Sequence, residues 1–195
     1  MQHWIELMKQ RRFSAMKNPP DKADLRRELI AARRTMPPDV KSQADERIIA
    51  ALSAWLESHQ ARSLGGYLAM AGEPELLPLY QSLAARGIVL AMPVVLEKQR
   101  PLVYQRWLPG EPLARDASGT MAPARRDELM QPEVVLAPCI GFNAQAYRLG
   151  YGGGYFDRTL AQSPRPKALG IAYKTTRVDF APDAHDIPLD LIITD

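Results

Sequence analysis

The sequence predicts an α/β fold: a single domain with a mostly parallel central sheet and helices flanking both of its faces. Three observations lead to this prediction. Stretches with helical periodicity alternate along the chain with short apolar stretches typical of strands, and glycine and proline punctuate the pattern. The chain has 195 residues, of which 46% are hydrophobic, enough for one sizeable core. Strands separated by helices favour a parallel sheet, because a crossover returns the chain to the same end of the sheet.

The N-terminal part is predicted to hold an extension followed by two helices. Residues 1–20 end in Asn18-Pro19-Pro20, and we expect this extension to be disordered or loosely docked, with 21–195 forming the domain. Asp21 stands at the N-cap position of the first helix. Apolar residues then follow at helical spacing, at Leu25, Leu29, Ala32 and Met36. A second helix is predicted over about 40–58.

The remaining elements alternate between strand and helix patterns. Strands are predicted at 64–70, 88–95, 102–108, 134–138, 168–173 and 189–194. Helices are predicted at 76–86 and from 152 to 162. The segment 110–126 is rich in Pro, Gly and Ala and is predicted to be a mobile loop. Ligands bind outside the carboxyl ends of strands in such sheets, so we expect the site at that edge.

Composition and charge exclude several classes of protein. No apolar run approaches the roughly 18 to 20 residues of a membrane helix, and no secretory signal is visible, so we expect a cytoplasmic protein with no membrane partner. Cys139 is the sole cysteine, which fits a reducing compartment. The net charge is +3, and the basic residues come in pairs such as Arg33-Arg34 that we interpret as surface. We therefore expect no nucleic-acid partner, and we expect a monomer.

A glycine-rich loop after the apolar strand at 134–138 carries the strongest chemical signal. Gly150, Gly152, Gly153 and Gly154 fall within five positions, just before a predicted helix. Uncovered backbone N–H groups and a helix N-terminus together favour phosphate, and Arg148 adds a cationic fork. Neither the Walker pattern nor the dinucleotide fingerprint matches. A tight turn that serves only strand-to-helix packing is the alternative interpretation.

The run from Arg148 to Asp157, RLGYGGGYFD, resembles the signature of the 5-formyltetrahydrofolate cyclo-ligase family, also called methenyltetrahydrofolate synthetases. Three further segments agree in order and spacing: Lys22-x-x-Leu25-Arg26, the stretch 67–75 and the stretch 186–190. The likeness spans about 21–195. It implies a NagB/RpiA/CoA-transferase-like architecture and a ligase of one-carbon metabolism that uses Mg²⁺ and ATP. Such an enzyme converts 5-formyltetrahydrofolate to 5,10-methenyltetrahydrofolate and releases ADP and phosphate.

The resemblance assigns roles to individual residues. ATP binding falls to Lys22, Arg26, Arg148, Leu149, Gly150, Tyr151, Gly152, Gly153, Gly154, Tyr155 and Phe156. Folate binding falls to Met70 and Glu75, with Glu73 as a rival of Glu75. Tyr151 and Tyr155 are candidates to stack on the folate or to pack the loop, and Trp107 is either a wall of the folate pocket or part of the core. Arg148 and Asp157 are the expected catalytic residues. Asp157 and Asp190 are the expected metal ligands, with Asp186 and Asp195 close to the latter in sequence.

One position departs from the family pattern, and two other classes of function stay open. Ala122 stands where many relatives carry Glu, so a substrate contact there is in doubt. A sugar-phosphate or CoA-handling enzyme of similar α/β architecture would bind an anionic substrate without hydrolysing ATP. A non-catalytic binder of folate or nucleic acid is the third interpretation.

Overall fold

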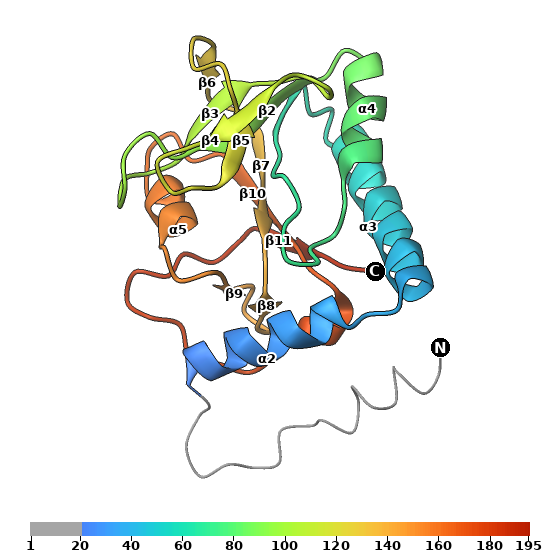
Figure 1. Cartoon of the computed structure of the whole chain (residues 1–195), viewed down its shortest axis with the longest axis vertical. Helices are drawn as coiled ribbons and strands as arrows, with labels where there is room; N and C mark the ends of the chain where they lie inside the picture. The colour runs from blue at the N-terminus through green and yellow to red at the C-terminus, as the bar shows by residue number, and fades with distance from the viewer. Residues whose placement is uncertain (1–20) are drawn as a thin grey trace.

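The computed structural model describes residues 21–195, so the predicted extension at 1–20 lies outside the described residues (Figure 1). A seven-stranded sheet forms the centre of the molecule. In spatial order its strands are β11 (Leu191–Ile193), β10 (Lys167–Ile171), β7 (Val134–Pro138), β1 (Ser63–Gly65), β2 (Val89–Val94), β3 (Val103–Arg106) and β6 (Leu129–Met130). The first five run parallel to one another, β3 pairs antiparallel with β2, and β6 pairs antiparallel with β3. The prediction of a mostly parallel sheet is confirmed.

Helices cover both faces of the sheet, as predicted. On one face lie α3 (Pro38–Ser58) and α4 (Leu77–Ala85), which pack apolar side chains against β1 and β7. On the other face α5 (Tyr155–Leu160) packs with the opposite side chains of β7 and β10. Because β7 is buried on both faces, its sequence reads as a continuous apolar run rather than an alternating one.

The first helix, α2 (Lys22–Arg34), lies across one end of the molecule (Figure 1). The Asp21 carboxylate caps it by accepting a hydrogen bond from the Ala23 N–H. Its buried stripe packs on the short ribbon formed by β8 (Gly141–Phe142) and β9 (Arg148–Leu149). This end is the carboxyl edge of the parallel strands, because β8 follows β7 directly.

The structure differs from the predicted elements in three places. Strand β1 ends at Gly65, well short of the predicted 64–70. Helix α5 begins at Tyr155 rather than at residue 152, because Gly152 and Gly154 adopt positive φ angles. The segment 110–126 contains a hairpin of β4 (Leu113–Arg115) and β5 (Met121–Pro123) rather than only irregular loop.

One side chain organises this hairpin. The Asp116 carboxylate accepts hydrogen bonds from the backbone N–H groups of Val95, Ser118 and Thr120. Burial alone would raise the pKa of Asp116, but these bonds and one from the Ser118 hydroxyl outweigh it and lower the pKa. The bond to Val95 ties the turn of the hairpin to the end of β2, which places it beside the site described next.

Candidate active site

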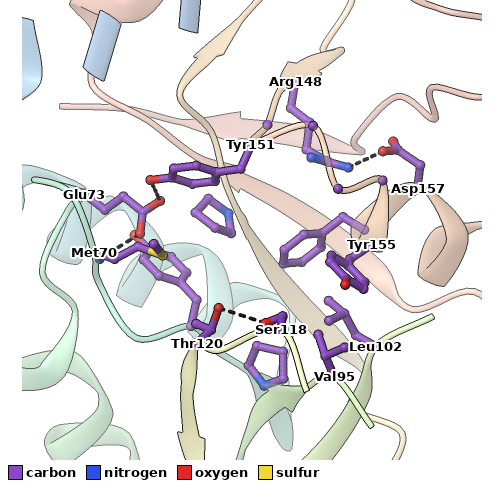
Figure 2. Close-up of a pocket in the computed structure, with 18 of the residues that line it drawn as sticks. Met70, Glu73, Val95, Leu102, Ser118, Thr120, Arg148, Tyr151, Tyr155 and Asp157 are labelled. Atoms are coloured by element: carbon purple, nitrogen blue, oxygen red, sulfur yellow. Dashed lines mark hydrogen bonds and ion pairs between the residues drawn. The ribbon is translucent and has the colours of Figure 1, made fainter. Parts of the chain in front are cut away.

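A cavity of about 440 Å³ opens at the carboxyl ends of β1, β2 and β7. The predicted edge of the sheet is therefore where the structure places a cavity. Many of the residues predicted for the site line it: Lys22, Arg26, Met70, Arg148, Leu149, Gly150, Tyr151, Gly152, Gly153, Gly154, Tyr155, Phe156 and Asp157. Figure 2 shows Glu73 with Tyr151 at one side of the cavity, Arg148 with Asp157 at another, and the hairpin residues Ser118 and Thr120 across from them.

The glycine loop can follow this path only with glycine at several positions. Gly152 and Gly154 have φ angles of +89° and +64°, which L-residues with a branched side chain resist. A Cβ at Gly150 would collide with the Arg148 guanidinium, and a Cβ at Gly153 would lie 2.9 Å from the Tyr155 ring. The glycines therefore line the cavity without side chains of their own, and neighbouring side chains pack where a Cβ would stand.

Two cations of α2 reach the same region from the far side of the loop. Arg26 Nε donates a hydrogen bond of 2.7 Å to the Gly150 carbonyl. Lys22 Nζ pairs with Asp183 at 2.7 Å and with Asp186 at 3.0 Å. Burial by itself would lower the pKa of Lys22, but the bonds and charges of the two carboxylates raise it above its ordinary value. Lys22 therefore carries a positive charge at neutral pH.

Arg148 and Asp157 form an ion pair at the base of the loop. Arg148 Nη2 lies 2.6 Å from Asp157 Oδ2, and their side chains are only 7% and 16% exposed. The guanidinium also lies over the Phe156 ring, 5.2 Å from its centroid. The other carboxylate oxygen of Asp157 accepts from the Ile187 N–H at 3.3 Å, which brings the backbone next to Asp186 against this pair.

The wall opposite α5 carries a buried acid. Glu73 is 2% exposed, and its two oxygens accept hydrogen bonds from the Met70 N–H and the Tyr151 hydroxyl, at 3.0 and 2.8 Å. Burial raises the pKa of the Glu73 carboxyl, while these two bonds and the charge of Arg33 oppose the rise. Every group bonded to Glu73 is a donor, so the arrangement suits the carboxylate. Met70 is half exposed beside it.

Three predicted residues lie outside the cavity lining. Glu75 is exposed, and its carboxylate accepts from the Leu77 N–H at the start of α4. Trp107 is buried in the core and follows β3, an antiparallel strand, so it lies beside Leu90 at the amino end of β2. Asp190 precedes β11 and also lies at the amino edge, where it pairs with Arg165 and Lys167.

Some residues at the site, or directly behind it, were not predicted from the sequence. Arg33 is 4% exposed rather than a surface residue. The signal was its spacing, because it continues the buried stripe of Leu25 and Leu29 at four-residue intervals. The hairpin residues that line the cavity, Asp116, Ser118, Thr120 and Met121, carried no comparable signal. Ala122, by contrast, is buried in β5 and outside the lining.

A model of the 5-formyltetrahydrofolate cyclo-ligase family matches residues 18–195. The chain belongs to this family. A 5-formyltetrahydrofolate cyclo-ligase of Haemophilus influenzae is 26% identical over 185 residues, which cover 90% of this chain and 99% of the relative. A second one, of Mycoplasma pneumoniae, is 51% identical over 67 residues, 33% of this chain and 40% of the relative.

Solved structures of methenyltetrahydrofolate synthetases share the fold. The Mycoplasma pneumoniae enzyme superimposes with a TM-score of 0.72 at 26% identity and covers 90% of this chain and 99% of its own. The Aquifex aeolicus enzyme gives a TM-score of 0.74 at 27% identity and covers 88% of both chains. Membership of the cyclo-ligase family confirms the resemblance and replaces the sugar-phosphate, CoA and non-catalytic interpretations.

Two features are absent from residues 21–195, the part of the chain that the structure describes. None of the helices there is long and apolar enough to cross a bilayer. Nor do three or more His, Cys, Asp or Glu side chains gather there into a ready-made metal cluster.

Proposed function

We propose that the cavity is where this chain converts 5-formyltetrahydrofolate to 5,10-methenyltetrahydrofolate, with the nucleotide at the glycine loop and the folate at the Glu73 wall. One observation carries this assignment: a glycine loop surrounded by cations and a buried carboxylate wall share a single cavity. Phosphoryl transfer between two substrates needs both of them in one space, with their reacting atoms in contact.

The reaction has two steps whose atoms balance. The formyl oxygen on N5 attacks the γ-phosphorus of ATP, the bond from phosphorus to the β,γ-bridging oxygen breaks, and ADP leaves. N10 then attacks the activated formyl carbon, loses its proton, and phosphate departs with the former formyl oxygen. Phosphorylation is needed because an amide oxygen is a poor leaving group, so ATP is consumed once for each ring closed.

We assign the triphosphate to the glycine loop and the cations around it. The loop supplies N–H donors, and Lys22 and Arg26 approach from α2. Arg148 is largely buried and lines the same cavity, so it is placed to neutralise charge that develops on the transferring group. Water exclusion by the Phe156 ring strengthens this interaction.

The donors near the loop fit Mg²⁺. This ion is bound in nucleotide sites by one or two carboxylates together with phosphate oxygens. Asp157 and Asp186 both line the cavity, and the Ile187 N–H bonded to Asp157 sets the two acids close along the chain path. Mg²⁺ held there would neutralise phosphate charge. We propose Asp157 and Asp186 as its protein ligands, in place of Asp190.

We assign the folate ring system to the wall of Glu73. Its carboxylate oxygens retain lone pairs that can accept hydrogen bonds from ring N–H and amino groups. Met70 supplies apolar surface beside it, and the Tyr151 and Tyr155 rings line the cavity between this wall and the loop. Either ring can stack on the pterin or aminobenzoyl group.

A direct assay tests the proposal. Purified protein is mixed with 5-formyltetrahydrofolate and Mg-ATP, and the conjugated methenyl product is followed by absorbance together with ADP release. We expect one ADP for each product formed, and no product without nucleotide or with excess EDTA. Product formation at an undiminished rate without ATP would refute the phosphorylation step. Turnover that returns when manganese is added after EDTA treatment would further support a bound divalent ion.

A further inference from the structure

Arg33 is a buried charge that the proposed reaction does not use. Its side chain is 1% exposed, and it does not line the cavity. It occupies the third position of a buried stripe on α2 whose other members are Leu25 and Leu29. A guanidinium in such a position costs considerable desolvation energy, so an aliphatic residue would serve packing better.

The contacts of Arg33 all point to the wall and loop of the cavity. Its Nε donates to the Ala71 carbonyl at 2.9 Å, and its Nη2 donates to the Tyr151 hydroxyl at 2.8 Å. The Tyr151 hydroxyl in turn donates to Glu73 at 2.8 Å. Arg33 Nη2 lies 3.9 Å from the same Glu73 oxygen. The remaining nitrogen, Nη1, is buried without a hydrogen-bond partner.

These contacts join three segments that are far apart in sequence. Arg33 belongs to α2, Glu73 to the turn after β1, and Tyr151 to the glycine loop. Gly72, between Ala71 and Glu73, has a φ of +76°, and a Cβ there would lie 3.3 Å from Arg33. The turn therefore packs closely against the side-chain stem and backbone of Arg33, while the guanidinium holds the Ala71 carbonyl.

We propose that Arg33 is a positioning residue for folate: it orients Tyr151 and Glu73 and keeps the Glu73 carboxylate charged behind the cavity wall. This inference rests on the proposed folate site at Glu73. The same helix carries Arg26 about 10 Å and Lys22 about 16 Å away along the axis. Helix α2 thus bears on both substrates at once, the nucleotide through its first turns and the folate through Arg33.

The charge of Arg33 acts on the Glu73 carboxyl in a defined direction. Glu73 is faced by the Arg33 cation, by the Tyr151 hydroxyl and, from the surrounding core, by the neutral groups of Tyr67, Tyr80 and Cys139. Arg33 is the positive charge among the causes that hold down the pKa of Glu73. Without Arg33, the pKa of Glu73 would rise further, because no positive charge would oppose the effect of burial. Folate binding would then weaken at a higher pH as the solution is acidified.

The experiment compares Arg33→Met, Arg33→Lys and the matched control Arg34→Met, an exposed arginine one residue further along the helix. Wild-type protein must first form the methenyl product, and its failure would reject the proposed function rather than the role of Arg33. For Arg33→Met we expect the KM for 5-formyltetrahydrofolate to rise about tenfold, with the KM for ATP within twofold of wild type. Arg34→Met should match wild type in both constants.

The pH profile separates positioning from a merely structural role. For Arg33→Met the acid limb of kcat/KM for folate should move to higher pH, and Arg33→Lys should return it toward wild type because the charge is restored. In a Glu73→Gln background, Arg33→Met should add little further loss, since its effect passes through Glu73. Thermal melting and circular dichroism check that each variant is folded.

Three outcomes would overturn the proposal. The first is a folded Arg33→Met variant with unchanged folate KM and pH profile. The second is equal damage to the ATP and folate constants, which would indicate general loosening of α2. The third is full additivity with Glu73→Gln, which would show that Arg33 acts independently of the acid. If Arg33→Met fails to fold, Arg33→Gln, which keeps hydrogen-bonding atoms but lacks the charge, decides by the same criteria.

Discussion

The two edges of the parallel sheet carry acids in similar local settings, yet only one edge is a site. At the carboxyl edge Asp157 pairs with Arg148 and accepts a backbone hydrogen bond from Ile187. At the amino edge Asp190 pairs with Arg165 and accepts a backbone hydrogen bond from Ala168 at 2.7 Å. Each acid thus has an arginine and an amide, and their residue types alone do not distinguish them.

The difference lies in what remains open around each acid. Asp157 faces a cavity beside a loop of uncovered N–H groups. Asp190 is engaged by Lys167 as well as Arg165, and its partners tie the starts of β10 and β11 together. Loops that follow neighbouring parallel strands can diverge and leave a crevice at the carboxyl edge. Topology, more than local charge, therefore distinguishes the acid that lines the cavity.

The largest effect is expected from Asp157→Asn, which we predict lowers kcat by about 100-fold or more. The change removes the negative charge that would hold Mg²⁺ against the phosphates, while folate affinity stays near wild type. Steady-state kinetics across a magnesium titration measure it, and raised magnesium should partly rescue turnover. Because the pair with Arg148 is mostly buried, we also expect a loss of stability, which thermal melting quantifies.

The same variant separates the loss of charge from a loss of folding. Asp157→Asn keeps an oxygen that can accept from Arg148, so most molecules should remain folded at assay temperature. Near wild-type turnover at low magnesium would remove Asp157 from the metal site. Activity lost only in proportion to folded protein would reduce it to an acid that stabilises the start of α5.

The second prediction compares glycines at the two edges. Gly152→Val should raise the KM for ATP by roughly 10- to 100-fold, because a branched side chain covers the N–H groups and resists the φ of +89°. Gly87→Val is the control: it has a φ of +80° and open space around it, but lies after α4 near the amino edge. Both should lose similar stability by melting. Equal ATP affinity in the two variants would mean that the loop is a structural turn.

The third prediction compares two acids that lie two positions apart in sequence, Glu73 and Glu75. Glu73→Gln should raise the KM for folate about tenfold, whereas Glu75→Gln should leave it unchanged, because Glu75 only caps α4. The pKa of Glu73 is raised by burial, so wild-type folate binding should weaken as the pH falls through that raised value. Glu73→Gln should abolish this acid limb. Titration of folate binding against pH, without ATP, measures both effects.

The order of elements and the glycine loop could be predicted from the sequence, since both depend on local patterns. Apolar runs fixed the positions of β2 and β7, and the signature from Arg148 to Asp157 located one wall of the cavity. The identity of the acids could not be predicted so well. Choosing Glu73 over Glu75 needs the direction of each side chain after a strand that ends early, at Gly65.

Residues far apart in sequence set the remaining features of the site. Asp186 and Asp190 are four residues apart, but Asp186 pairs with Lys22 at the cavity, whereas Asp190 stands directly before β11 and accepts from the Ala168 N–H at the amino edge. The hairpin at 110–126 joins the site through Asp116 and the Val95 N–H, a contact across 21 positions. Arg33 shows the opposite case: it was predicted to lie on the surface, although its helical spacing with two buried leucines was a local signal of burial.

The smallest effect is expected at the amino edge, from Asp190→Asn. Activity should stay within twofold of wild type, because the side chain lies outside the cavity. The free energy of unfolding should fall by about 1 kcal/mol, since Asn keeps one acceptor for the Ala168 N–H but loses the charge that faces Arg165 and Lys167. For a chain of this size that is a drop in Tm of about 2 to 4 °C.

The pH dependence of that loss identifies its cause. Burial alone would raise the pKa of Asp190, but the Ala168 hydrogen bond and the two cations lower it below the ordinary 3.8. A lowered pKa stabilises the fold above the ordinary value, and this contribution disappears as the pH falls through the lower, folded-state value. Urea unfolding should therefore show a difference between wild type and variant at pH 7 that shrinks in strong acid. A constant difference would assign the loss to packing, and a loss of turnover in the stable, folded variant would bring the amino edge into the mechanism.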